Sequence, residues 1–246
     1  MMDRAASLAP AVEVLSMAGV RFRWPGRQGF SLAIQGFTLG RGETLLLTGP
    51  SGSGKSTLLS LLCGVVTPEQ GGVTVLGTEM TRLASVQRDH FRAEHFGIIF
   101  QMFNLLPYLS ILDNVLLPLS FARGRRGRVV NGGKTPEAEA RRLLASLGLD
   151  ADAFAGQPAA ALSVGQQQRV AAARALIGAP EIVVADEPTS ALDRDRQQEF
   201  LDLLFRDLGA AAASLVMVSH DESLAPRFDR VLPLAEIAVV GQGSDP

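Results

Sequence analysis

The segment GPSGSGKS at residues 49–56 constrains this chain more than any other part of its sequence. An apolar run at residues 42–48 precedes it and predicts a buried strand, and a second apolar run at residues 57–63 predicts the start of a helix. Strand, glycine-rich turn and helix form the context in which the pattern G-x-x-x-x-G-K-[ST] binds phosphate. Glycines let successive backbone N–H groups point at one anion, and the helix N-terminus adds partial positive charge there. The segment therefore predicts a nucleotide phosphate site.

The side chains of this segment suit a nucleoside triphosphate. Lys55 can reach the outer phosphates, and the Ser56 hydroxyl can ligate Mg²⁺. The residues that we expect to contact the nucleotide here are Gly49, Ser51, Gly52, Ser53, Gly54, Lys55, Ser56 and Thr57.

Strand-like and helical patterns surround a middle segment that lacks strands. Short β-like segments occur at residues 12–15, 21–24 and 30–37, and the run FGIIF at 96–100 predicts a central strand. From residue 162 the pattern alternates helix, strand, helix, strand, which predicts a mostly parallel sheet with helices on both faces. Residues 102–161 show only helical patterns. We therefore expect one domain over residues 1–246, with its core in 1–101 and 162–246 and a helical insert in 102–161.

One part of this insert is unusually basic. Residues 123–134 read RGRRGRVVNGGK, which is rich in glycine and arginine and has no apolar period. The composition predicts an exposed, mobile loop, because runs of charge usually solvate a surface. A functional basic patch is the alternative.

Composition restricts the partners and the compartment. The net charge of −2 argues against a nucleic-acid partner bound through a broad basic surface. The single cysteine, Cys63, lies among apolar residues and fits a core thiol in a reducing compartment. No stretch approaches the roughly 18–20 apolar residues of a membrane span, so we expect any membrane role to come through a partner.

Polar residues follow several predicted strands. The run IVVADE at 182–187 is a buried strand that ends in two carboxylates, at the sheet edge where parallel strands bind ligands. Asp186 is suited to hold the Mg²⁺ shell, and Glu187 to polarise the water that attacks the γ-phosphate. Gln101 can reach the metal or that water, and His220 can donate a hydrogen bond to the γ-phosphate.

A second anion site is predicted at residues 162–169, LSVGQQQR, where Ser163 lies at the cap of a helix. The N–H groups of Ser163 and Gly165 could hold an anion there. Each of these motifs is common alone, whereas their order and spacing together are specific.

From about Val12 to Val240, the chain resembles the ATP-binding cassette (ABC) ATPases. GPSGSGKS resembles Walker A, Gln101 the Q-loop, LSVGQ at 162–166 the signature and IVVADE Walker B. SALD at 190–193 resembles the D-loop, His220 the switch histidine, and Trp24 the aromatic that stacks on adenine. The resemblance implies an α/β fold, with a P-loop NTPase core built on a mostly parallel sheet, an N-terminal antiparallel β subdomain and an inserted helical subdomain.

The resemblance also implies a shared active site. In this family two cassettes meet head to tail, and each ATP lies between Walker A of one copy and the signature of the other. It implies catalytic roles for Glu187, His220 and Gln101, and Mg²⁺ ligation by Ser56, Gln101 and Asp186. Nucleotide contacts implied outside Walker A come from Trp24, Ser163, Gly165, Gln166 and Asp193. Val164 replaces a glycine of the usual LSGGQ, and we expect it to leave the backbone donors accessible.

The partner implied by the resemblance is an integral membrane permease, which would hold the chain on the cytoplasmic face of the inner membrane. The stretch from His95 to Pro118 resembles the lipoprotein-release, macrolide-export and cell-division branch. Phe103, Leu105, Leu106 and Leu109 either line a groove for a permease helix or pack the helical insert. An importer ATPase and a soluble switch of the same family are the alternatives. Sugar importers often add a C-terminal regulatory domain, for which we expect no room before Pro246.

Overall fold

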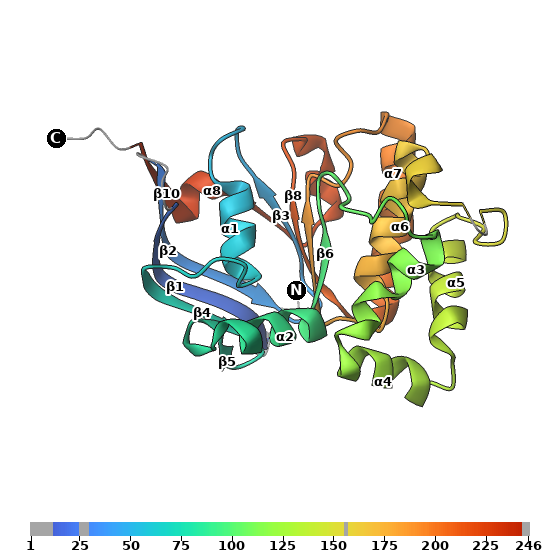
Figure 1. The fold of residues 1–246 in the computed structure, drawn as a ribbon. Helices are drawn as coiled ribbons and strands as arrows, with labels where there is room; N and C mark the ends of the chain where they lie inside the picture. The colour runs from blue at the N-terminus through green and yellow to red at the C-terminus, as the bar shows by residue number, and fades with distance from the viewer. Residues whose placement is uncertain (1–11, 25–29, 155–156, 243–246) are drawn as a thin grey trace, which may run out of the picture.

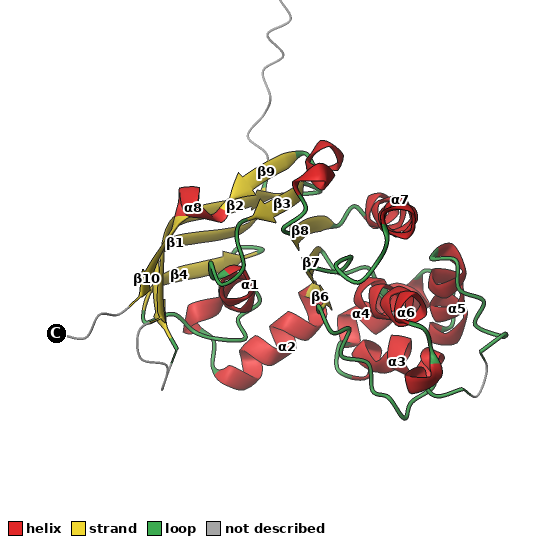
Figure 2. Ribbon diagram, turned by 90° about the horizontal axis from the view of Figure 1, so that it is seen from above, coloured by secondary structure: helices red, strands yellow, loops and turns green. Residues whose placement is uncertain are grey.

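The computed structural model describes residues 12–24, 30–154 and 157–242. It has an antiparallel sheet, a parallel sheet and a helical group, formed by the helices labelled α3 to α7, which packs beside the parallel sheet (Figure 1). Seen from above, the parallel sheet lies between the antiparallel sheet and the helical group (Figure 2). The predicted α/β class, with an antiparallel and a parallel sheet, is confirmed.

The antiparallel sheet has the order β10-β2-β1-β4-β5. Its strands are β1 (Glu13–Arg23), β2 (Phe30–Gly40), β4 (Gln70–Val75), β5 (Thr78–Glu79) and β10 (Ala238–Gln242). The prediction of separate strands at 12–15 and 21–24 was wrong, because β1 is continuous. Gly19 has a φ of +58° within the stretch where the register with β4 shifts. This glycine therefore serves a bulge inside one strand and not a turn between two.

The parallel sheet has the order β6-β7-β8-β3-β9. Its strands are β3 (Thr44–Thr48), β6 (Phe96–Ile99), β7 (Ile182–Asp186), β8 (Ser214–Val218) and β9 (Arg230–Pro233). The inner strands are covered on both faces, which explains their nearly continuous apolar sequences. All five run in the same direction, so their carboxyl ends share one edge.

Side-chain alternation along the inner strands divides the interior into two cores. Leu45 and Leu47 of β3 point to the same side as α1 (Lys55–Leu62) and the antiparallel sheet. Leu46 points to the other side, where α6 (Val164–Leu176) and α7 (Arg194–Ala211) pack. Cys63 is buried in the first core, as predicted for a core thiol. This burial raises the pKa of the thiol to about 12.

The remaining helices are mostly short. They are η1 (Met80–Arg82), α2 (Ser85–His95), α3 (Ile111–Leu116), η2 (Leu117–Ser120), α4 (Arg123–Asn131), α5 (Pro136–Ser146), η3 (Ala159–Ala161), η4 (Glu222–Arg227) and α8 (Leu234–Ile237). Within the described ranges, no helix is both long and apolar enough to cross a membrane.

The prediction of a loop at 123–134 was wrong, although most residues of this segment are exposed as expected. Residues 123–131 form α4, in which Arg125 and Val129 are buried. The Glu94 carboxylate accepts hydrogen bonds from the backbone N–H groups of Gly124 and Arg125, at 2.8 and 3.1 Å, and so satisfies donors at the start of the helix. Tertiary contacts therefore override the poor helix propensity of the glycines.

Candidate nucleotide-binding site

The glycine-rich segment lies between the end of β3 and the start of α1, as predicted. Gly54 is the N-cap of α1 and has a φ of +98°. A β-carbon there would lie 3.1 Å from Leu32 Cδ1 and 3.3 Å from the Phe30 ring. The backbone conformation favours glycine at this position, and a β-carbon would also press on the two side chains of β2.

Lys55 is held against this loop. Its side chain is almost fully buried, and its Nζ donates to the carbonyl oxygens of Gly49 at 2.6 Å and Pro50 at 2.9 Å. These bonds fix the ammonium group beside the turn, where the phosphates of a nucleotide would approach the backbone N–H groups.

A cavity of about 400 Å³ lies over the loop and the carboxyl edge of the sheet. Its lining residues are Trp24, Phe30, Ser51, Gly52, Gly54, Lys55, Ser56, Thr57, Gln101, Asp186 and Glu187. The structure therefore brings together the phosphate loop, Gln101 two residues beyond β6, and the two carboxylates at the end of β7, although they are far apart in sequence.

The two carboxylates differ in environment. Asp186 ends β7 and is partly buried, and this burial raises the pKa of its carboxyl, against a hydrogen bond from Ser56 and the positive charge of Lys55. Glu187 has a φ of +44°, which is unusual for a residue with a side chain. Its N–H donates to Val218 O at 3.0 Å, so β8 holds this strained backbone in place.

His220 follows β8 and lies beside Glu187. Its Nδ1 is 3.2 Å from Glu187 Oε2, and its side chain is 60% exposed, so the ring stays accessible from outside. His220 lines an adjoining cavity of about 650 Å³ together with Gly49 and Ser53. These three residues thus lie on the second side of the phosphate loop.

Trp24 forms the rim of the first cavity. Its Nε1 donates to Thr57 Oγ1 at 3.1 Å, and its ring packs edge-on against Phe22 with centroids 5.1 Å apart. Phe30 is a second aromatic lining residue, which the sequence analysis did not identify as a site residue. The signal was its position two residues before Leu32 on β2, so that both face α1.

Oxygen donors suited to Mg²⁺ occur together at the cavity floor. The Ser56 hydroxyl, the Asp186 carboxylate and the Gln101 amide belong to residues that line the same cavity. Hard oxygen ligands of this kind fit Mg²⁺.

The predicted second anion site lies elsewhere. Ser163 caps α6, and its hydroxyl accepts from Gln166 N at 3.4 Å, while Ser163 N donates to Gln166 Oε1 at 2.8 Å. The Ser163 N–H, expected to hold an anion, is therefore already bonded to Gln166. Ser163, Gly165 and Gln166 do not line the nucleotide cavity. Asp193 does not line it either, and instead caps α7 by accepting from Arg196 N at 3.0 Å.

Neither Val164 nor Gly165 is tightly surrounded by other residues of this chain. Val164 is the first residue of α6, in a helical conformation, and its side chain is 49% exposed. The position therefore does not require glycine. A β-carbon on Gly165 would meet only Leu192 Cδ2, at an ordinary 3.9 Å.

A groove of about 480 Å³ lies between α2, β6 and η2, and its apolar walls include Phe100, Leu117, Pro118 and Phe121. None of the four apolar residues considered for such a groove lines it: Phe103, Leu105, Leu106 and Leu109. Phe103 is buried, and Leu105 packs against the core of the helical group. Of the two interpretations of these residues, the packing one fits Phe103 and Leu105.

Comparison with known proteins identifies the family. The family described as "ABC transporter" matches residues 33–190. The chain is 38% identical to the lipoprotein-releasing system ATP-binding protein LolD 1 of Caulobacter vibrioides, over 85% of this chain and 86% of that protein. It is also 38% identical to the macrolide export ATP-binding/permease protein MacB of Rhodopseudomonas palustris, over 94% of this chain. It spans only about a third (34%) of that relative.

A solved structure agrees with these relatives. The dimeric post-hydrolysis state of the ATP-binding cassette MJ0796, bound to ADP and Pi, superposes with a TM-score of 0.77 at 32% identity. The alignment covers 89% of this chain and 93% of that one. The predicted resemblance to the lipoprotein-release and macrolide-export branch is confirmed. This chain is an ATP-hydrolysing cassette of the ABC transporter family.

Proposed function

We propose that two copies of this chain close head to tail around two ATP molecules and drive a separate membrane permease of an export or force-transmitting system. The observation that carries this proposal is the separation of the two phosphate-binding segments. Ser163 and Gly165 do not line the cavity that contains Lys55 and Ser56. A second copy can supply them to that cavity, whereas the α6 of the copy that forms the cavity does not.

Within one copy, the residues of the nucleotide cavity and of the adjoining cavity divide the work on ATP. Lys55 and the loop N–H groups bind the phosphates, and Trp24 stacks on the adenine. Glu187 polarises the attacking water, and His220, bonded to Glu187, orients the γ-phosphate. Gln101 positions the same water. Mg²⁺, held by Ser56, Asp186 and Gln101, would neutralise the charge that develops on the phosphates.

Across the dimer, the signature of the second copy completes the site. The start of α6 offers backbone N–H groups and the partial positive charge of the helix. Gly165 has room for a methyl group within its own chain, so the glycine suits a close approach by a ligand from outside. Ser163, Gln166 and Asp193 are the other residues that we expect at this interface.

The groove beside α2 is the proposed contact with the permease. Its apolar walls and the exposed Phe121 suit a short helix of a membrane protein. Residues 102–161 would act as the helical subdomain that carries one wall of this groove. The chain would then lie on the cytoplasmic face of the inner membrane, with no nucleic acid as partner. LolD and MacB, by their names, belong to release and export systems.

The mass of Glu187→Gln protein tests the dimer. We expect this variant to bind ATP without rapid turnover, so that light scattering after gel filtration gives twice 26.1 kDa with MgATP and 26.1 kDa with MgADP. A monomer in saturating MgATP would contradict the dimer.

The ATP-trapped dimer also tests the permease. Pull-down from detergent-solubilised membranes is expected to recover a permease with few spans and a large external domain. Phe121→Asp should lose it, whereas Val239→Asp, on the antiparallel sheet and similarly exposed (66% against 63%), should keep it. Recovery of a many-span permease with a solute-binding protein would favour an importer, and recovery of no membrane protein would favour a soluble switch.

A further inference from the structure

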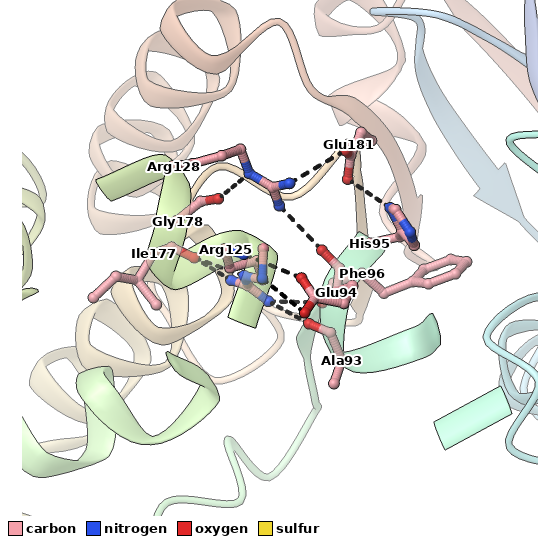
Figure 3. Close-up of polar contacts among 10 residues, drawn as sticks. Ala93, Glu94, His95, Phe96, Arg125, Arg128, Ile177, Gly178 and Glu181 are labelled. Carbon is pink, nitrogen blue, oxygen red and sulfur yellow. Dashed lines mark hydrogen bonds and ion pairs between the residues drawn. The ribbon is translucent and has the colours of Figure 1, made fainter. Parts of the chain in front are cut away.

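Arg125 of α4 is an arginine almost without solvent exposure (2%). Its side chain points between two segments that are distant in sequence, the end of α2 with the start of β6 and the end of α6 (Figure 3). Such burial is unusual for a charged residue, because the hydration that the guanidinium group loses must be replaced by other polar groups.

Backbone carbonyl groups provide the compensation. Arg125 Nε donates to Ile177 O at 2.8 Å, and Nη2 donates to Ala175 O at 2.8 Å and also to Ile177 O. On the other side, Nη1 donates to Phe96 O at 3.0 Å and to Ala93 O at 3.4 Å. One guanidinium group therefore ties the end of α6 to the junction of α2 and β6.

The electrostatic environment favours a cation at this point. Ala93 lies in the last turn of α2 and Ala175 in the last turn of α6, so two helix C-termini direct their partial negative charge at the guanidinium. Burial lowers the pKa of Arg125 to about 10, together with the charge of Arg128 and against that of Glu94, and the group is still charged at neutral pH. A neutral side chain of similar size would leave these carbonyl groups unpaired.

Arg128 strengthens the same connection from one helical turn further on. Its Nε donates to Gly178 O at 2.8 Å, and its Nη2 donates to Glu94 O at 3.1 Å. Glu181, the residue before β7, has carboxylate oxygens 3.6 Å from Arg128 Nη1 and 3.1 Å from His95 Nδ1. These contacts surround the turn between α6 and β7 (Figure 3).

The helix held in this way carries the signature at its other end. α6 runs from Val164 to Leu176, and its 13 residues give it a length of about 20 Å. A tilt of about 10° at the held end would move Ser163 by about 3 Å. This displacement equals the donor–acceptor distance of one hydrogen bond. The orientation of α6 relative to β6 therefore decides where the signature lies.

We propose that Arg125 is a positioning residue for the signature half of the nucleotide site. It fixes the C-terminal end of α6 against β6, and so places Ser163 and Gly165 for the ATP bound by a second copy. The proposal rests on the head-to-tail dimer for its functional consequence, but the placement of α6 belongs to the single chain. Arg125 also lines the groove beside α2, so a permease helix bound there would lie next to this connection.

The first measurement is the distance between spin labels on α6 and on the core, in monomeric protein without nucleotide. Labels at Val164→Cys and Val65→Cys use two exposed positions, and the buried Cys63 thiol is unreactive. Arg125→Met should shift or broaden the distance distribution by about 3 Å, the displacement that a tilt of about 10° gives over the length of α6. Arg125→Lys keeps a cation between the helix ends and should shift it less. Arg126→Met, an exposed residue of the same helix, should leave it unchanged.

The second measurement is the ATP concentration at half-maximal dimerisation, in the Glu187→Gln protein without labels. Arg125→Met should raise it about fivefold, the effect of one lost hydrogen bond of average strength at the interface, and Arg125→Lys should raise it less. The affinity of the monomer for MgADP should not change, because the Walker A loop is not altered. Thermal melting sets a temperature at which every variant is folded. If Arg125→Met does not fold, Arg125→Lys and Arg128→Gln take its place.

The two readouts together decide the proposal. A label distance or a dimerisation midpoint that equals the parent value in folded Arg125 variants would overturn it, because Arg125 would then only contribute stability. If the Glu187→Gln parent does not dimerise at all, the proposed function fails, and the label distance alone still decides whether Arg125 positions α6.

Discussion

The nucleotide cavity and the signature segment differ in how each is built. In the cavity, side chains bind residues that other elements contribute: Trp24 bonds to Thr57, and Glu187 to His220. In the signature segment, the side-chain hydrogen bonds of Ser163 and Gln166 join these two residues to each other. The cavity is thus assembled by the sheet edge, whereas the start of α6 is a locally capped helix end.

This difference indicates which part of the site is complete in one chain. The strained backbone of Glu187 is held by β8, which is typical of a group positioned for chemistry in the monomer. Val164 is half exposed, and Gly165 has room for a β-carbon, so their surroundings in one chain do not explain the segment. The exposure of Val164 and the free space beside Gly165 are compatible with the proposed second copy at this surface.

The largest expected effect comes from blocking that surface. Ser163→Arg places a long charged side chain at the proposed interface and should abolish ATP-dependent dimerisation of the Glu187→Gln protein, measured by light scattering. Binding of MgADP to the monomer should be unchanged. Thr135→Arg is the matched control, because Thr135 caps α5 by accepting from Ala138 N at 3.1 Å. Each substitution costs a cap worth about 1 kcal/mol, so dimer loss in both would remove the difference between the two surfaces.

Removal of the Glu187 carboxylate tests the cavity instead. Glu187→Gln should lower steady-state ATP turnover by about 10²–10⁴, the usual contribution of a positioned general base, with little change in ATP affinity. Phosphate release measures the turnover. Glu43→Gln is the matched control. It makes the same chemical change at the amino edge of the parallel sheet, where Glu43 pairs with Arg230. Parental turnover in Glu187→Gln would exclude Glu187 from the reaction.

Lys55→Ala should weaken ATP binding without loss of the fold. A hydrogen bond from a charged group contributes about 1.5–3 kcal/mol, which corresponds to about 10- to 150-fold in the dissociation constant. Isothermal titration with MgATP measures this change. The other lysine of the chain, Lys134, pairs with Glu139 on the surface, and Lys134→Ala should keep the parent affinity. Equal affinities for parent and Lys55→Ala would contradict the phosphate-binding role of the loop.

The sequence predicts the cavity well because its information is local. The glycines of the loop, the apolar strands and the carboxylates after them each specify a backbone state, and parallel strands bring their ends to one edge. Lys55, Asp186 and Glu187 therefore line the cavity as their pattern indicates. Phe30 was missed because its spacing from Leu32 indicates only that the two share a face of β2, and not that this face packs against α1.

The basic segment shows where local information fails. Its glycines and arginines disfavour a helix, yet Glu94 satisfies the first N–H groups of α4, and carbonyl groups of α6 and β6 bind Arg125. These partners lie about 30 to 50 residues away along the chain. Composition describes Arg125 as a surface charge, whereas the fold makes it a buried link between two parts of the molecule.

The smallest expected effect concerns the rim of the cavity. Trp24→Ala removes the aromatic face and should weaken MgATP binding by about 0.5–1.5 kcal/mol, or about 2- to 12-fold, since aromatic stacking has this size. Trp24→Tyr keeps a stacking face and should lie closer to the parent. The chain has one tryptophan, so the intrinsic fluorescence of the parent should change on nucleotide addition and report the same affinity. If fluorescence is constant while titration calorimetry detects binding, the base does not contact Trp24, and the cavity would recognise only the phosphates.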